Sequence, residues 1–196
     1  MITLCIKNLK NVWFGAACGE EKVFATAFAF SRQQALQKLL LNIPFNVPFQ
    51  HLDKPTDFAE KVIDTLESIY EGKDISKKFS LAMGHLSSYA QKVIETVALI
   101  PVGYVASYGS VAKAAGGSPR SVGRIMALNP FPLIVPCHRV VASNLSLGGY
   151  SGGLEVKREI LNRERRGYNT KREVPVNGVK LQVLPVELLL SKNIKQ

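Results

Sequence analysis

The sequence predicts a mixed α/β protein (α+β class) with a small N-terminal strand-and-helix domain and a mainly helical C-terminal domain. The 196 residues are 46% hydrophobic and 20% charged, which is typical of a chain with a packed core. Short β-rich runs crowd the first 30 residues, and apolar residues recur at helical spacing after residue 87. We place the domains at 1–80 and 81–166, followed by a C-terminal extension at 167–196.

The N-terminal domain begins with three runs typical of strands and continues with two helices. The strands are "TLCIK" (3–7), "VWFGAAC" (12–18) and "KVFATAFAF" (22–30), with a turn at 19–21. A helix is expected over 31–43, with Ser31 as its N-cap. A second helix over 56–72 places Phe58, Val62, Leu66 and Ile69 on one face and ends at Gly72.

The C-terminal domain is expected to contain a helix-turn-helix unit of winged-helix-like type. A helix over 87–100 stops before Pro101, and "SYGSVAKAAGG" (107–117) is a short helix that ends at two glycines. In "SPRSVGRIMALNP" (118–130), Ser118 can cap the next helix and Pro119 suits its first position. In the extension, Asn177-Gly178 between alternating apolar residues predicts a hairpin, and "VELLL" (186–190) follows as part of an ordered cap.

Composition favours an intracellular protein that contacts a polyanion. Residues 1–100 carry 11 Lys/Arg against 10 Asp/Glu, whereas residues 101–196 carry 14 against 5, so nearly all of the net charge of +10 lies in the second half. A solvated basic face is the alternative. No signal peptide or membrane span is visible. Three cysteines without CxxC spacing argue against a disulfide framework, and a metal site from Cys5, Cys18 and His51 or His85 stays a minor alternative.

The stretch "LIVPCHRVV" (133–141) places a thiol beside an imidazole. In an extended chain, neighbouring side chains point to opposite faces, so Cys137 and His138 are not expected to form a direct pair. Three prolines, at positions 130, 132 and 136, stiffen the approach to the cysteine. A glycine-rich loop, "LGGYSGG" (147–153), and a helix, "LEVKREILNRE" (154–164), follow. A rigid nucleophile, a basic helix-turn-helix and a glycine loop together indicate chemistry on a nucleobase.

From about residue 84 to residue 164 the chain resembles the active-site domain of the O6-alkylguanine-DNA alkyltransferases. The resemblance is carried by "PCHRV", the Asn-Pro eight residues upstream and the "GGYSGG" loop. It implies a methylated-DNA–protein-cysteine methyltransferase that acts once, in DNA repair, without a cofactor or a metal. Cys137 would accept the alkyl group as a stable thioether. His138 would act through a water, Glu164 would orient His138, and Asn129 would brace the turn.

The resemblance also implies how double-stranded DNA that contains O6-alkylguanine is bound. The implied contacts to the extruded guanine come from Tyr108, Met126, Val140, Tyr150 and Ser151. Arg120 would enter the base stack through the minor groove, while Arg124, Ser107 and Ser121 would contact DNA beside it. The protein is expected to be a cytoplasmic monomer, associated with the nucleoid if the cell is prokaryotic, with no membrane partner.

Two other functions are compatible with parts of the sequence. A protein that binds alkylated guanine without repairing it would resemble relatives that lack the cysteine, whereas Cys137 is present. A cysteine hydrolase would need Cys137 and His138 in direct contact and an oxyanion hole, and it would leave the basic helix-turn-helix without a role. The sequence departs from the family at Val102, Tyr104 and Ile94, where packing residues replace the usual ones.

Overall fold

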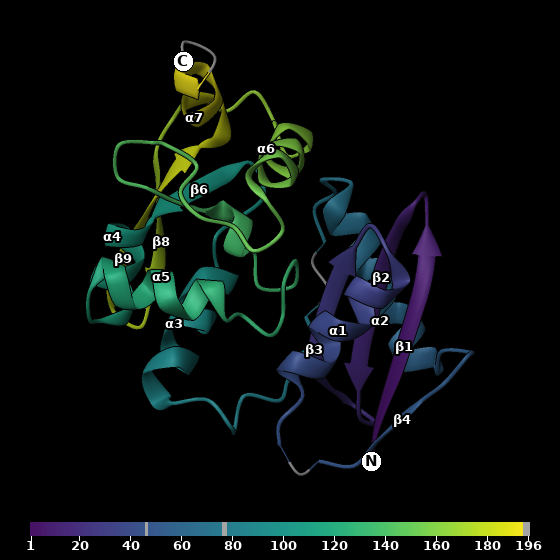
Figure 1. Cartoon of the computed structure of the whole chain (residues 1–196). Coiled ribbons are helices and arrows are strands. Elements are labelled where there is room, and N and C mark those ends of the chain that lie inside the picture. The colour runs from purple at the N-terminus through teal and green to yellow at the C-terminus, as the bar shows by residue number, and fades with distance from the viewer. Residues whose placement is uncertain (46, 76–77, 194–196) are drawn as a thin grey trace. The chain divides into compact units, whose positions relative to one another are not determined.

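The computed structural model describes residues 1–45, 47–75 and 78–193, and its contacts divide the chain into two compact units. The first unit comprises Met1–Tyr70, Asp74–Leu86 and Pro130–Ile134. The second comprises Glu71–Lys73, Ser87–Asn129 and Val135–Gln196. Figure 1 labels most of the elements of both units.

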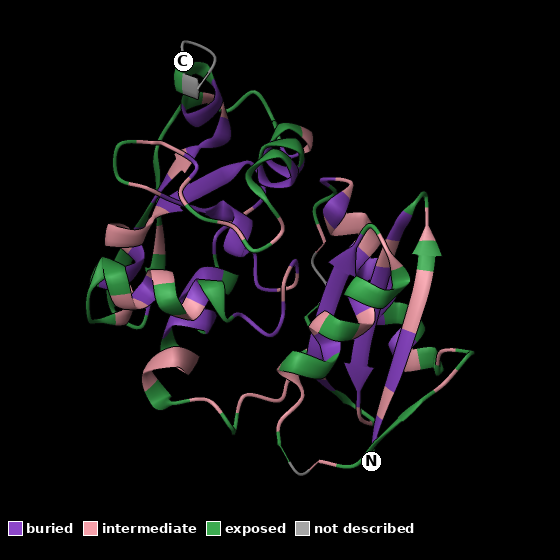
Figure 2. Ribbon diagram, in the orientation of Figure 1, coloured by how far each residue is buried: buried purple, intermediate pink, exposed green. Residues whose placement is uncertain are grey.

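The first unit is built on a five-stranded sheet in the order β4-β1-β2-β3-β5. The three long strands are β1 (Ile2–Leu9), β2 (Val12–Cys18) and β3 (Lys22–Ala29), and they pair antiparallel as the sequence predicts. Two short strands, β4 (Phe49–His51) and β5 (Ser80–Leu81), join parallel to its edges. Nearly every residue of β2 and β3 is buried, because helices cover both faces of this sheet (Figure 2).

The two helices of the first unit contact opposite faces of the sheet. Helix α1 (Arg32–Asn42) is capped by Ser31, as predicted, and its Leu39 packs in the core with Ile2 and Leu4. The absence of a side chain at Gly15 permits this approach, since a Cβ there would lie 2.7 Å from Leu39 Cδ1. Helix α2 (Asp57–Tyr70) covers the other face, where the Tyr70 ring lies 5.7 Å from the rings of Phe14 and Phe28.

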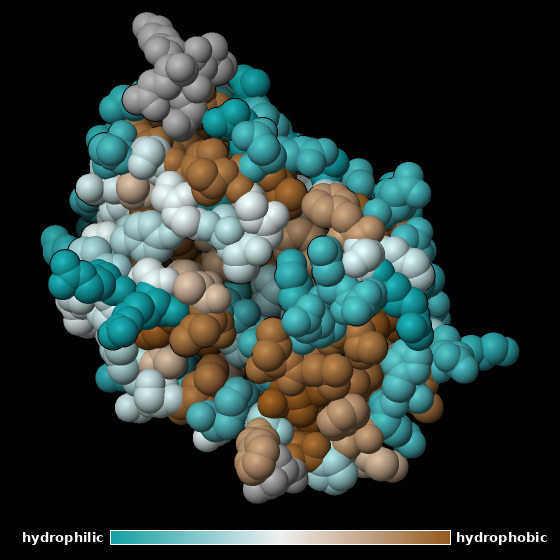
Figure 3. Space-filling model, viewed as in Figure 1, coloured by the Kyte–Doolittle hydropathy of each residue, from teal (hydrophilic) through white to brown (hydrophobic). Residues whose placement is uncertain are grey.

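Part of the first unit's surface is apolar. Several large hydrophobic side chains are exposed in the second half of α1 and in the segment after it, and Figure 3 shows the apolar surface there. They include Leu40, Leu41, Phe45 and Phe49.

The second unit contains four helices that the sequence predicts. They are α3 (Ser88–Ala98), α4 (Tyr108–Ala115), α5 (Pro119–Ala127) and α6 (Leu154–Arg163). Ser118 caps α5 in a capping box with Ser121, and Pro119 occupies the first turn as expected. Helices α4 and α5 contact each other and are joined by the residues 116–118.

This unit also contains a four-stranded sheet, in the order β7-β6-β9-β8, that the expectation of a mainly helical domain did not include. Strands β6 (Tyr104–Ser107) and β7 (Val140–Val141) are too short to show a period of two in the sequence. Strands β8 (Arg172–Val176) and β9 (Val179–Pro185) form the predicted hairpin. Asn177 and Gly178 both have positive φ, at 46° and 81°, as a type I′ turn requires.

The C-terminal extension is part of the second unit's core. Strand β9 pairs antiparallel with β6, and helix α7 (Val186–Asn193) contributes Val186, Leu189 and Leu190 to the same cluster as Val105 and Leu161. The predicted extension at 167–196 is therefore not a separate layer, although its last three residues lie outside the described ones. Residues 130–134, which the sequence assigns to 81–166, belong to the first unit because Thr26 bonds the carbonyls of Pro130 and Pro132 at 2.9 Å each.

Among the described helices, none is both long and apolar enough to cross a bilayer.

Replacing Leu189 with Ala should lower the free energy of unfolding of the second unit by about 2–5 kcal/mol, because a fully buried side chain would be replaced by a cavity. The neighbouring Leu188 is 37% exposed, so Leu188→Ala should cost less than about 1 kcal/mol. Amide hydrogen exchange of residues in the second unit measures both effects. Equal costs at the two positions would contradict the placement of α7 in the core.

Candidate active site

The segment that carries Cys137 forms a tight turn and not an extended strand. Pro136 has φ −78° and ψ 65°, an inverse γ-turn, and the Cys137 amide donates to the Val135 carbonyl at 2.8 Å. Residues Cys137–Arg139 then form one turn of 3-10 helix, η1. The expectation of an extended chain is wrong here. The separation of the two side chains still results, since Cys137 lines a cavity while His138 is fully buried against α6.

Two short strands bring the cysteine turn beside the start of α4. Strand β7 follows η1 directly and pairs parallel with β6, matching Ala106 with Val140 and Ser107 with Val141. Strand β6 leads straight into α4, so Tyr108 is held close to Cys137. A chain segment some 30 residues earlier therefore supplies one wall of the cavity.

Asn129 is hydrogen-bonded to the segment that carries Cys137. Its side-chain nitrogen donates to the Val135 carbonyl at 3.1 Å, and the side chain is buried. Its side chain also makes a hydrogen bond to Cys137, which acts to lower the pKa of the thiol.

A fully buried carboxylate lies behind the cysteine. Glu164 ends α6 as its C-cap, and its Oε1 lies 2.9 Å from His138 Nε2. Arg139 donates to both carboxylate oxygens, at 3.0 Å from Nε to Oε2 and 2.7 Å from Nη2 to Oε1. The same guanidinium reaches back to the Ile100 carbonyl, 2.7 Å from Nη1. One carboxylate thus joins η1 to α6, and Arg139 extends the link to the end of α3.

Charge and burial decide the protonation of this cluster. Burial acts to raise the pKa of Glu164, but the charges and hydrogen bonds of His138 and Arg139 outweigh it and lower the pKa to about 2. Burial lowers the pKa of His138, opposed by Glu164, so the imidazole is neutral near pH 7. Since a carboxylate only accepts, Nε2 carries the proton and Nδ1 offers a lone pair. That Nδ1 is buried and meets no hydrogen-bond partner within the described part of the chain.

The thiol of Cys137 is protected from premature ionisation. Burial raises its pKa, while the hydrogen bond from Asn129 and the charge of Lys157 act in the opposite direction. The group is therefore a thiol at rest, with neighbours that favour the thiolate once a base removes the proton.

A cavity of about 290 Å³ opens onto Cys137 and gathers most of the residues that the sequence assigns to base contact. Of that set, Tyr108, Met126, Tyr150 and Ser151 line it with Cys137. Val140, whose main-chain carbonyl the resemblance assigns to the base, is not among the lining residues, and that carbonyl accepts from Lys157 Nζ at 2.6 Å. Three further residues line the cavity: Gly149, which belongs to the glycine-rich loop that the sequence analysis singles out, and Gly123 and Ala127 of α5, which it does not. On a helix, a glycine or an alanine carries no signal of a binding role in a single sequence.

Glycine at position 148 lets the loop approach Tyr108. Gly148 has φ 69°, and a Cβ there would lie 3.0 Å from the Tyr108 ring. The Tyr108 hydroxyl in turn donates to the Gly149 carbonyl at 3.5 Å. The ring is thus held between α4 and the loop at the mouth of the cavity.

The four residues expected to contact DNA lie on or beside α4 and α5. Arg120 and Arg124 are exposed, and neither forms an ion pair with any residue that the structure describes. Ser107 and Ser121 have structural roles: Ser107 accepts from the Ser110 amide at 3.0 Å as the N-cap of α4, and Ser121 completes the capping box of α5. The Ser121 hydroxyl also lies 3.1 Å from that of Tyr89.

Two buried cations, Arg139 and Lys157, were not singled out from the sequence. The side chain of Lys157 is fully buried, and its Nζ donates to the Val140 carbonyl at 2.6 Å. Glu164 is likewise not on a helix surface. The adjacency of Arg139 to the Cys-His pair was the one signal that could have pointed to it.

Comparison with known proteins gives consistent results. Residues 88–166 match the family model described as 6-O-methylguanine DNA methyltransferase, DNA binding domain. The methylated-DNA–protein-cysteine methyltransferase of Thermococcus kodakarensis is 35% identical over 164 residues, 78% of this chain and 88% of that one. That of Methanothermobacter thermautotrophicus is 39% identical over 111 residues, 56% of this chain and 63% of that one.

A solved structure gives the same relationship over nearly its whole length. The O6-methylguanine-DNA methyltransferase from Pyrococcus kodakaraensis KOD1 superposes with a TM-score of 0.62 at 31% identity, covering 84% of this chain and 99% of that one.

Replacing Glu164 with Gln should lower the free energy of unfolding by about 3–5 kcal/mol at neutral pH, because Arg139 would stay buried without its counter-charge. The depressed pKa of Glu164 contributes stability that is present above its unfolded pKa of about 4.3 and is lost as pH falls toward about 2. The difference between Glu164→Gln and the unmodified chain should therefore shrink over that window in denaturant titrations.

The matched control is Glu159→Gln on the same helix. Glu159 pairs with Arg163 at the surface, so its loss should cost less than about 1 kcal/mol and show no such pH window. A cost for Glu164→Gln as small as that of the control would mean that the buried cluster does not hold the fold.

Proposed function

The chain belongs to the family of methylated-DNA–protein-cysteine methyltransferases, and from that premise we propose that it repairs DNA by moving an alkyl group from the O6 atom of guanine to the sulfur of Cys137. The observation that carries this assignment is the order of three side chains. Cys137 faces the cavity, neutral His138 lies behind it, and ionised Glu164 fixes His138 from the far side.

In the proposed reaction, Cys137 loses its proton to His138 Nδ1 through a bridging water molecule. The hydrogen bond between Nε2 and Glu164 stabilises the imidazolium that forms. The thiolate then attacks the alkyl carbon, so that the S–C bond forms as the C–O6 bond breaks. The electron pair of the broken bond leaves with the guanine, and the thioether remains on Cys137.

The departing guanine would be stabilised by a hydrogen bond from Tyr108. Burial and the nearby charge of Cys137 raise the pKa of Tyr108, against a backbone hydrogen bond at Gly149 that acts to lower it, so the hydroxyl keeps its proton as the thiolate forms. Tyr150, Ser151 and Met126 would contact the base from the loop and from α5. A thioether is not readily hydrolysed, so each molecule would act once, as a monomer.

Access to the cavity from duplex DNA requires the base to be extruded. We assign this step to the helix-turn-helix formed by α4 and α5, with Arg120 filling the gap in the stack through the minor groove. The exposure of both arginines and the excess of positive charge in residues 101–196 support the assignment.

Cys137→Ala is expected to abolish alkyl acceptance and to leave DNA affinity nearly unchanged, because affinity comes from phosphate contacts and not from the nucleophile. Intact mass after incubation with methylated DNA should show a gain of one methyl group for the unmodified chain and none for the variant. Peptide mapping should place that group on Cys137 and leave Cys5 and Cys18 unmodified. A gain of one methyl group by the Cys137→Ala variant would contradict the assignment.

Arg120→Ala is expected to slow repair of duplex DNA by at least about tenfold, since extrusion of a base costs a few kcal/mol. The rate of transfer from free O6-benzylguanine should change little, because no base has to be extruded from a duplex. The matched variant is Arg124→Ala, one turn away on the same helix, which should weaken binding and reduce the slope of log affinity against log salt by about 0.9 or less. Equal losses on both substrates for Arg120→Ala would assign Arg120 to the fold or the cavity.

A further inference from the structure

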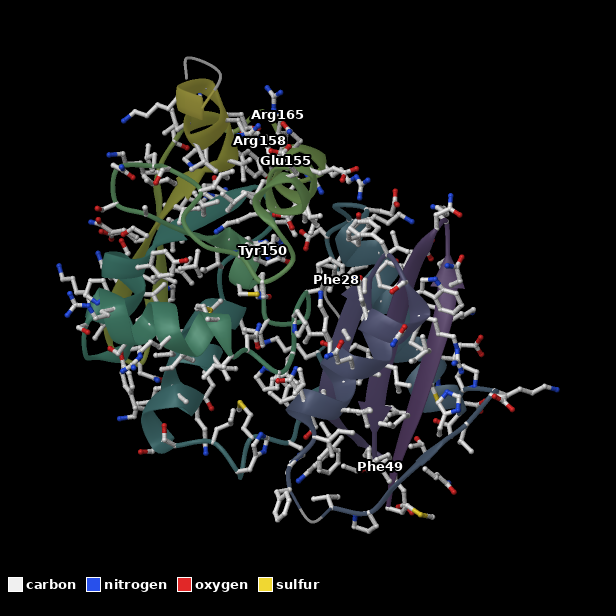
Figure 4. The ribbon with its side chains drawn as sticks, in the orientation of Figure 1. Phe28, Phe49, Tyr150, Glu155, Arg158 and Arg165 are labelled. Carbon is white, nitrogen blue, oxygen red and sulfur yellow. The ribbon has the colours of Figure 1, made fainter. Side chains whose placement is uncertain are left out.

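Glu164 is the C-cap of α6, where the helix ceases to fix the path of the chain. Its backbone amide still donates to the Ile160 carbonyl at 3.1 Å, but the chain leaves the helix directly afterwards. A carboxylate at a helix C-terminus also meets the negative end of the helix dipole, so this location is unfavourable in itself. In Figure 4 the next residue, Arg165, lies on the outer side of α6, away from Tyr150 of the cavity loop. The path of the chain beyond Glu164 therefore decides whether its carboxylate reaches His138.

The side chain of Glu187, in the first turn of α7, holds the segment that follows α6. Its Oε1 accepts from the backbone amides of Arg166 at 2.9 Å and Gly167 at 2.7 Å. These two residues belong to no helix or strand, so Glu187 supplies the partner that secondary structure does not. Two successive amides that converge on one carboxylate oxygen form a small anion-binding nest. A side chain of the C-terminal extension therefore fixes the backbone two and three residues beyond Glu164.

The second oxygen of the Glu187 carboxylate is enclosed by the protein. Oε2 is buried and meets no hydrogen-bond partner among the residues that the structure describes. Withdrawing a carboxylate from water costs free energy, which the amides of Arg166 and Gly167 and the positive end of the α7 dipole offset here. Because one oxygen is enclosed and the other is bound twice, the carboxylate has little freedom to turn.

Helix α7 is itself anchored on both sides of Glu187. The Val186 amide donates to the Gly103 carbonyl at 2.9 Å, just before β6 begins. Leu189 is fully buried in the same apolar cluster as Leu161 of α6. A side chain that positions another group must come from a rigid element, and α7 meets this condition.

Arg166 completes the connection with its own side chain. Its Nη1 donates to the Arg165 carbonyl at 2.9 Å and to the Arg163 carbonyl at 3.2 Å, which lie on either side of Glu164. Its Nη2 donates to the Gly72 carbonyl. The last carbonyls of a helix lack partners within the helix, and a guanidinium beside them is favourable. The amide of Arg166 therefore binds α7, while its guanidinium binds the end of α6.

We propose that Glu187 is a positioning residue for alkyl transfer, which acts through Glu164 on His138. By fixing the end of α6, Glu187 holds Glu164 Oε1 at 2.9 Å from His138 Nε2. Arg139 binds both oxygens of the same carboxylate. If the end of α6 moved, the carboxylate would therefore stay with Arg139 and release the imidazole. The inference rests on the proposed function, because the base that Glu164 orients is the one assigned there.

The test compares Glu187→Ala with Glu173→Ala. Both remove one carboxylate from the extension, but Glu173 lies in an exposed ion pair of the hairpin. The readout is the tautomer of His138, given by the nitrogen-15 chemical shifts of its ring, with His51 and His85 replaced by Gln so that one histidine remains. The parent chain and Glu173→Ala should show the Nε2–H form alone, whereas Glu187→Ala should also contain the Nδ1–H form. Identical tautomers in all three would overturn the proposal.

Transfer from free O6-benzylguanine gives a second readout, and Glu187→Gln gives the rescue. The rate should fall about tenfold in Glu187→Ala, because a base that is misplaced loses much of its effect. Glu187→Gln keeps an oxygen acceptor for the amides of Arg166 and Gly167, so it should retain most of the rate. An unchanged rate in Glu187→Ala, or an equal loss in Glu187→Gln, would contradict the positioning role. If the unmodified chain failed to react with O6-benzylguanine while the tautomers differed as expected, the proposed function alone would fail.

Two further measurements cover the case in which Glu187→Ala does not fold. Glu187→Asp keeps the charge but withdraws the carboxylate by one methylene, and it then takes the place of the alanine variant with the same expected and contrary outcomes. In the unmodified chain, the exposed amides of Arg166 and Gly167 should exchange with solvent at least about tenfold more slowly than in an unstructured peptide, because Glu187 binds them. Unprotected exchange at both amides would refute the attachment and with it the proposal.

Discussion

The Glu164 carboxylate is the interaction on which the rest of the site depends. A buried charge of this kind is tolerated only when it is fully paired, and Glu164 is paired on both sides, by the Arg139 guanidinium and the His138 imidazole. Because its partners are adjacent in the chain, they must emerge from a turn tight enough for both to reach one carboxylate. The 3-10 turn of η1 meets this condition and leaves the preceding residue, Cys137, directed to the cavity.

The same cluster explains why the imidazole is neutral and not a permanent cation. Arg139 neutralises much of the Glu164 charge. The effect of burial, which lowers the pKa of His138, therefore outweighs the effect of Glu164, and the ring is neutral. The carboxylate then fixes the tautomer, which leaves Nδ1 as the acceptor. Arg139 thus sets the chemical character of its neighbour without reaching the cavity, where it does not appear among the lining residues.

The cavity is assembled from segments that are distant in the sequence and are held by few contacts. A two-residue strand, β7, fixes the cysteine turn beside α4. A single ammonium joins the loop of Gly149 to that turn. The extension supports both from behind, because β9 extends the sheet of β6 and α7 completes the apolar cluster around Val105 and Val141. Removal of the C-terminal extension should therefore disturb the cavity, although no residue of α7 lines it.

The sequence by itself determined the long or periodic elements, those with clear start and stop signals, and the proposal that Cys137 is the nucleophile. Helices α2 and α3, the capped start of α5 and the Asn177-Gly178 hairpin follow from local spacing and turn chemistry, which act over a few residues. Only the tertiary structure decided the short strands β6 and β7, since two to four residues show no periodicity. It also decided that Arg139 and Lys157 are internal. A lysine or arginine in a sequence can be either a solvated surface residue or a paired buried one. Which of the two it is depends on whether carbonyls and carboxylates from distant segments lie next to it in the folded protein.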